Sequence, residues 1–180
     1  LFILGTFIYL FVFYEIKKFF KKFFKLIFIY LSSSYLFFSL YFFIFFDYLI
    51  FYVFVFTIIF LDSFSYFIGK LFGKNYIFKF ISPQKTLEGY VGGIFFTNAL
   101  LIFYFYYIHS NLDLLMFVTL INLIIFFSII GDLIESYFKR KNHIKDSSNY
   151  LPGHGGYFDR FDSFLSSIIV LTLFSFVINL

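Results

Sequence analysis

The chain has 180 residues, of which 62% are hydrophobic, a formal net charge of +4 and no cysteine. A soluble domain averages about 45–50% apolar residues, so the composition excludes an ordinary water-soluble protein, and the lack of cysteine excludes disulfides and thiolate metal sites. Apolar runs about long enough to cross a bilayer core of roughly 30 Å recur along the whole chain, which excludes a single signal peptide as their explanation.

These runs predict an all-α, polytopic membrane helix bundle that forms a single transmembrane domain over residues 1–180. We expect six spans, at about 1–14, 26–46, 48–68, 93–108, 114–131 and 163–180. The chain begins at Leu1 and its only methionine is Met116. We therefore expect either an N-terminally truncated chain or a non-standard start codon.

The basic residues fall into three clusters separated by long segments without lysine or arginine. Their members are Lys17, Lys18, Lys21, Lys22 and Lys25; Lys70, Lys74, Lys79 and Lys85; and Lys139, Arg140, Lys141, Lys145 and Arg160. The positive-inside rule places all three clusters on the cytoplasmic side. Residues 109–113 then form an outer turn between the fourth and fifth spans.

The first basic cluster lies in the segment from Glu15 to Lys25, where pairs of lysine and phenylalanine alternate. We interpret this segment as an anchor on the anionic cytoplasmic leaflet, with phenylalanine among the lipids and lysine at the head groups. Direct binding of an acidic lipid is the alternative.

Small and polar residues share one helical face at the end of the third span. They are Asp62, Ser65, Tyr66, Gly69 and Gly73. The glycines favour close helix packing. Asp62 needs another explanation, because a carboxylate beside a span is costly and usually functional.

A loop is predicted over Ser82–Gly93, where Pro83 ends any preceding helix. Ser82 and Thr86 offer hydroxyls, Lys85 offers a cation, and three glycines allow close backbone approach. Such a loop can bind phosphate through backbone N–H groups and lysine. The alternative is that it only turns the chain.

The densest polar segment runs from Gly131 to Ser163. Its first part extends the fifth span as a helix with one polar stripe, made of Asp132, Glu135, Ser136, Lys139, Arg140 and His143. Asp146 follows in a loop, and a glycine-rich stretch then surrounds His154. Asp159 and Asp162 lie at the start of the sixth span, where either could cap the helix. A solvated charged linker is the alternative for the whole segment.

This residue set predicts chemistry on a phosphate ester. Hard oxygen ligands without cysteine favour Mg²⁺ over zinc. Asp132 and Asp159 lie at the cytoplasmic ends of consecutive spans and could meet across the helix pair, with lysine and arginine beside them to hold phosphates. His154 could be a general base, a phosphate hydrogen-bond donor or a structural residue.

The segment from Ser136 to Asp162 resembles the signature of the phosphatidate cytidylyltransferase (CDP-diacylglycerol synthase) family. That signature is Ser, two residues, Lys-Arg, four residues, Lys-Asp, then Leu-Pro-x-His-Gly-Gly and Asp-Arg-x-Asp, and every specified position matches. The earlier segments resemble the family's Asp-Ser/Thr…Gly-Lys and Ser-Pro-x-Lys-Thr-x-Glu-Gly motifs. The chain departs from the family at Gln84, where lysine is frequent, at Lys70, where arginine is common, and in lacking two or more spans.

The resemblance implies transfer of CMP from CTP to phosphatidate, giving CDP-diacylglycerol and pyrophosphate, with Mg²⁺ as cofactor. Implied catalytic residues are Asp132, Asp146, His154, Asp159, Asp162, Lys145 and Arg160, with Asp132 and Asp159 as the metal ligands. Implied substrate-binding residues are Asp62, Ser82, Lys85, Thr86, Ser136, Lys139, Arg140, Gly155 and Gly156.

The partners implied are CTP, phosphatidate, membrane lipids and a second copy of the chain in a homodimer, with no nucleic acid. We expect a multi-pass protein of a bacterial inner membrane or of an organelle membrane of bacterial descent. Its active-site segment, residues 132–162, is expected on the cytoplasmic side.

Three alternative functions predict different sequence or biochemical features. A CDP-alcohol phosphotransferase would carry an Asp-Gly-x-x-Ala-Arg pattern, which is absent. A transporter or other non-enzymatic membrane protein predicts no dependence on CTP and Mg²⁺. A truncated, inactive copy is the third alternative, and the intact motifs argue against it.

Overall fold

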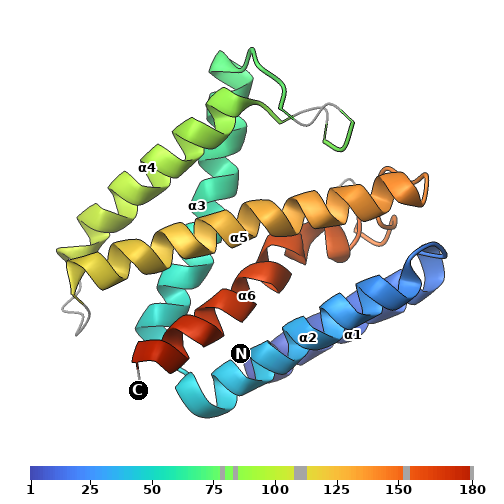
Figure 1. Ribbon diagram of the computed structural model, residues 1–180, viewed down its shortest axis with the longest axis horizontal. Coiled ribbons are helices and arrows are strands. Elements are labelled where there is room, and N and C mark those ends of the chain that lie inside the picture. The colour runs from blue at the N-terminus through green and yellow to red at the C-terminus, as the bar shows by residue number, and fades with distance from the viewer. Residues whose placement is uncertain (78–79, 83–84, 108–112, 152–154, 179–180) are drawn as a thin grey trace. The chain divides into compact units, whose positions relative to one another are not determined.

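The computed structural model describes residues 1–77, 80–82, 85–107, 113–151 and 155–178. These ranges contain six α-helices and one short π-helix, and no β-strand, which confirms the predicted all-α class. The elements are α1 (Phe2–Phe19), α2 (Phe24–Leu40), η1 (Tyr41–Phe45), α3 (Tyr48–Phe72), α4 (Leu87–Phe105), α5 (Leu114–Lys141) and α6 (Phe158–Ile178) (Figure 1).

Five of the described helical segments are long and apolar enough to cross a membrane: α2 with η1, α3, α4, α5 and α6. The fold is therefore a polytopic membrane helix bundle, and the chain is an integral membrane protein. The predicted first span forms α1, which is not among the five. Its 18 residues include Glu15, Lys17 and Lys18, and charges within a span are costly.

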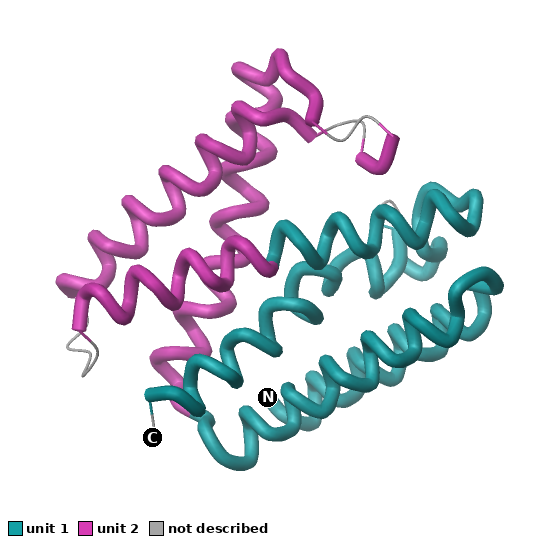
Figure 2. The backbone as a smooth tube through the Cα atoms, in the orientation of Figure 1, with its two compact units in different colours: residues 1–46, 128–180 teal, residues 47–127 magenta. Residues whose placement is uncertain are grey.

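The chain divides into two compact units (Figure 2). One comprises residues 1–46 and 128–180, and the other comprises residues 47–127. The boundary at residue 127 falls inside α5, so each unit contains part of this helix. The expected single transmembrane domain stays a prediction, and the two units are described separately below.

Glycines allow α3 and α4 to pack closely in the unit of residues 47–127. A Cβ atom added to Gly69 would lie 3.1 Å from Thr86 Oγ1 and 3.6 Å from Gly89 Cα. A Cβ atom on Gly93 would collide with the hydroxyl of Ser65. The packing role predicted for Gly69 is thus confirmed.

The loop predicted over Ser82–Gly93 is wrong in its second half, because α4 begins at Leu87. The Thr86 hydroxyl accepts a hydrogen bond from the Gly89 backbone N–H at 3.2 Å, which caps the helix. The later glycines therefore lie in a helix that packs against α3 and not in a phosphate-binding loop.

Buried hydroxyl groups link α1, α2 and α6 in the unit of residues 1–46 and 128–180. The Tyr9 hydroxyl and Ser34 Oγ lie 2.6 Å apart, and Ser34 Oγ donates to the Leu165 carbonyl at 2.6 Å. α1 and α2 run side by side (Figure 1). These bonds satisfy polar groups that would otherwise be costly in an apolar interior.

Small side chains line the crossing between α6 and the second half of α5. Ser128 Oγ and Ser167 Oγ lie 2.8 Å apart, and Ser163 Oγ donates to the Ser128 carbonyl at 3.2 Å. A Cβ atom on Gly131 would collide with Ser166 Oγ. Small residues let two helix backbones approach closely, and this approach brings together Asp132, which follows the crossing residues on α5, and Asp162, which precedes them on α6.

Replacing Gly131 with leucine is expected to force α5 and α6 apart. Overpacking of this kind costs about 1–3 kcal/mol, so the thermal midpoint of the detergent-solubilised protein should fall. The control is Val177→Leu, which adds a methylene at a side chain of α6 that is 69% exposed. Equal midpoints for the two variants would contradict a tight crossing at Gly131.

Candidate active site

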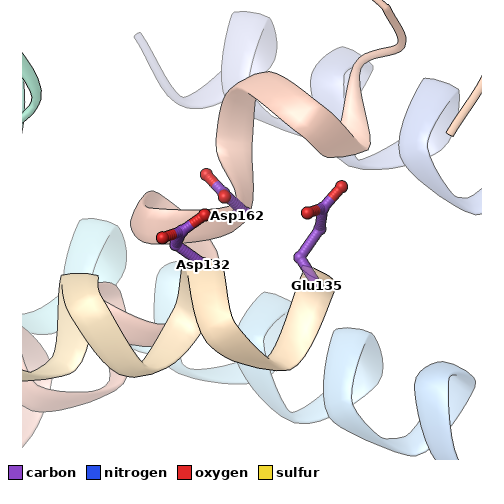
Figure 3. A group of neighbouring side chains, drawn as sticks. All are labelled: Asp132, Glu135 and Asp162. Carbon is purple, nitrogen blue, oxygen red and sulfur yellow. The ribbon is translucent and has the colours of Figure 1, made fainter. Parts of the chain in front are cut away.

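Three carboxylates from α5 and α6 form the acidic centre of the candidate site. Asp132 and Glu135 lie one turn apart on α5, and Asp162 lies on α6 (Figure 3). One oxygen atom of each carboxylate lies within 4.8 Å of those of the other two. Carboxylates this close repel one another, and a bound cation relieves the repulsion. Three hard oxygen donors therefore fit a divalent metal ion.

Asp159, the second predicted metal ligand, contacts a lysine and backbone N–H groups. Lys139 Nζ donates to Asp159 Oδ1 at 2.9 Å and lies 2.8 Å from Glu135 Oε1. The N–H groups of Ser147 and Gly156 donate to Asp159 Oδ2 at 2.9 and 2.7 Å. Lys139 thus bridges Asp159 and the acidic centre, while the metal role of Asp159 stays a prediction.

Two glycines bring the backbone close to carboxylates just before α6. Gly155 has a φ of 78°, a left-handed conformation that favours glycine, and a Cβ atom there would collide with Asp159. A Cβ atom on Gly156 would overlap Glu15 and Ser147. The predicted site residue His154 lies outside the described residues.

Residues 1–178 match the model of the cytidylyltransferase family. The chain belongs to the cytidylyltransferase family. It is 38% identical over 112 residues to a protein named phosphatidate cytidylyltransferase from Staphylococcus aureus strain COL. It is 43% identical over 114 residues to one with the same name from Staphylococcus epidermidis strain RP62A.

The matched segment covers 62% of this chain and 43% of each relative. The match therefore extends over less than half the length of these curated relatives. The family resemblance seen at Ser136–Asp162 is confirmed by the family match.

The remaining predicted residues of the 132–162 segment differ in burial. Ser136 is buried on α5 directly after Glu135. Four charged residues are exposed: Arg140, Lys145, Asp146 and Arg160. In this cytidylyltransferase family member, these three cations are thus exposed, whereas Lys139 and the acidic centre are partly or fully buried.

Four predicted substrate-binding residues belong to the other unit: Asp62, Ser82, Lys85 and Thr86. Asp62 is exposed on α3, whereas Thr86 is buried as the cap of α4. Lys85 Nζ lies 5.7 Å from the centre of the Tyr90 ring, within reach of a cation–π interaction. That these residues meet the 132–162 segment stays a prediction.

Glu88, the glutamate of the Ser-Pro-x-Lys-Thr-x-Glu-Gly motif, holds the chain that follows α3. Its carboxylate accepts the Lys74 N–H at 3.1 Å and the Asn75 side-chain amide at 2.7 Å. This motif position therefore has a structural explanation within its own unit.

Two carboxylates of the site were missed as site residues in the sequence. Glu135 belongs to the polar stripe predicted on the fifth span, but the stripe does not predict a role for it. Glu15 lies in the segment interpreted as a membrane anchor, yet it is fully buried and accepts the Tyr157 N–H at 2.8 Å. The signal was present, because Glu15 is the only acidic residue among the first 46 and a carboxylate in an apolar helix is usually functional.

Proposed function

We propose that the chain is a phosphatidate cytidylyltransferase, which makes CDP-diacylglycerol and pyrophosphate from CTP and phosphatidate. The observation that carries this proposal is the complete Ser136–Asp162 sequence motif, whose last residue, Asp162, belongs to the acidic centre, in a member of the cytidylyltransferase family. The name of the staphylococcal relatives supports the same lipid substrate.

In the proposed reaction, a phosphate oxygen of phosphatidate attacks the α-phosphorus of CTP and forms a new P–O–P linkage. The bond from the α-phosphorus to the oxygen that bridges the α- and β-phosphorus atoms breaks, and pyrophosphate leaves with that electron pair. Both substrates are anionic, so catalysis requires cations and N–H donors around the phosphates.

The acidic centre fits the Mg²⁺ ion that such a reaction needs. In this proposal Asp132, Glu135 and Asp162 would hold Mg²⁺, whose charge would offset that of the triphosphate. Lys139 is fixed by Glu135 and Asp159 and donates to a phosphate oxygen. The exposed cations, Arg140, Lys145 and Arg160, bind further phosphate oxygens, and Asp146 and His154 keep their implied catalytic roles.

We also propose that the reaction takes place on the cytoplasmic side of a bacterial inner membrane or an organelle membrane of bacterial descent. Five of the basic residues lie in or beside the active-site segment, and the positive-inside rule assigns such clusters to the cytoplasm. CTP is available there. The homodimer implied by the family resemblance stays a prediction.

Membrane vesicles containing the full-length protein test both the reaction and its side. Inverted vesicles supplied with phosphatidate, Mg²⁺ and external CTP should form CDP-diacylglycerol, and right-side-out vesicles should not, because CTP does not cross the bilayer. Product in neither preparation, nor in detergent, would reject the enzyme in favour of a non-enzymatic membrane protein.

A further inference from the structure

We propose that Glu15 of α1 is a positioning residue that holds the Gly156 backbone and the start of α6 in place for CTP binding. This inference rests on the proposed function, because it names a further residue of the same site. It replaces the membrane-anchor interpretation for this one side chain and leaves that interpretation for the neighbouring lysines.

The contacts of Glu15 reach the active-site segment across more than 130 residues of sequence. Its Oε2 accepts the backbone N–H groups of Tyr157 and Phe158 at 2.8 and 3.1 Å. Its Oε1 accepts the hydroxyl of Ser147. All three partners donate, which suits an ionised carboxylate because it only accepts.

These N–H groups are the ones that a helix start leaves without intrahelical acceptors. Phe158 is the first residue of α6, and Tyr157 precedes it. A negative charge at this end also interacts favourably with the helix dipole. Glu15 therefore supplies from α1 the capping interaction that α6 would otherwise need from its own flanking residues.

Glu15 and Asp159 accept hydrogen bonds from different donor groups of the same segment. Ser147 donates its N–H to Asp159 and its hydroxyl to Glu15, while the Gly156 N–H donates to Asp159 and the next N–H donates to Glu15. Asp159 also accepts a hydrogen bond from Lys139. On this proposal, a shift of the segment held by Glu15 would therefore reach the lysine proposed to hold phosphate.

Glu15 is fully buried, and two aromatic pairs on either side of it in the sequence join α1 and its C-cap to the start of α6. The rings of Phe11 and Tyr157 stack with centroids 5.0 Å apart, and those of Phe20 and Phe158 meet edge to face at 5.7 Å. A buried, charge-assisted hydrogen bond is stronger than one exposed to water. The burial of Glu15 therefore makes its contacts specific, since a displaced carboxylate would find no water to replace its partners.

The test compares Glu15→Leu, Glu15→Gln and the control Lys17→Gln, an exposed position on the same helix. Replacing a residue that orients the ligands of a metal site typically reduces affinity or activity 10–100-fold. By the same reasoning, we expect the KM for CTP to rise about 10-fold or more in Glu15→Leu. Glu15→Gln keeps one acceptor oxygen and should show a smaller rise. Lys17→Gln should match the wild type.

A purely structural role would reduce the amount of active protein, and so the apparent kcat, without changing the KM for CTP. Hydrogen exchange adds a readout that needs no substrate. The amides of Tyr157 and Phe158 should exchange faster in both Glu15 variants, whereas peptides from α3 and α4 should not change.

Unchanged exchange at these two amides in Glu15→Leu would overturn the proposal. Faster exchange with an unchanged KM for CTP would also overturn it, because Glu15 would then stabilise the fold without positioning the site. If the wild type formed no CDP-diacylglycerol, the proposed function would fail, and exchange would still decide whether Glu15 holds this segment.

Discussion

Asp162→Asn and Asp132→Asn are each expected to reduce CMP transfer by about 100-fold or more, the scale seen when one electrostatic contact to a transition state is removed. Both carboxylates belong to the acidic centre, where one oxygen of each lies within 4.8 Å of the others. Asparagine preserves the shape of both side chains, and at position 162 it keeps an oxygen that can accept the Ser163 N–H, as Asp162 Oδ1 does. The variants therefore lose charge and metal affinity with little change in packing.

Initial rates measured across a range of Mg²⁺ concentrations check this prediction. The Mg²⁺ requirement should shift to higher concentration, and any Mg²⁺-dependent rise in the thermal midpoint should disappear. Asp113→Asn is the matched control, because it removes an exposed carboxylate directly before α5, the helix that carries Asp132. A near-normal rate with an unchanged Mg²⁺ requirement in both variants would exclude the acidic centre as the metal site.

Asp159→Asn is expected to abolish turnover while leaving membrane insertion intact. The substitution removes the charge that pairs with Lys139 and weakens the acceptor for the Ser147 and Gly156 N–H groups. Charge-assisted hydrogen bonds are about twice as strong as neutral ones, so the lysine and the glycine backbone should both lose their fixed positions. Product formation and membrane-fraction yield measure the two halves of this expectation.

Comparison with Lys139→Gln separates two roles for Asp159. A metal ligand would change the Mg²⁺ requirement when it is replaced. A residue that positions Lys139 would leave that requirement unchanged, and the Asp159→Asn and Lys139→Gln effects would overlap in the double variant and not add. Near-normal turnover in Asp159→Asn would reject both roles.

Helical periodicity predicted the part of the site that lies on one helix. The spacing of the polar stripe indicated that the fifth span continues as a helix, and α5 does run to Lys141. His143 is an exception, because it follows the helix end with a φ of 58°. The stripe could not show which carboxylates meet Asp162, since that depends on the close crossing allowed by Gly131.

Long-range backbone contacts explain what the sequence could not predict. Glu15 accepts hydrogen bonds from backbone N–H groups 142 and 143 positions away. Every residue except proline has such a group, so the sequence does not indicate which residues donate. A loop is expected over Ser82–Gly93 because Pro83 ends any preceding helix and its glycines allow close backbone approach. The structure shows instead that the glycines of this segment lie in close contact with α3, which the sequence could not indicate.

The length of α5 has a consequence for where a lipid substrate would react. At 1.5 Å per residue, its 28 residues extend about 42 Å, which exceeds a hydrocarbon core of about 30 Å. Glu135 and Lys139 lie in its last two turns, so a helix that spans the core carries them to the depth of the phospholipid head groups. In the proposed reaction, phosphatidate would then present its phosphate to the site while its acyl chains remain in their own leaflet, and only CTP would have to arrive from water.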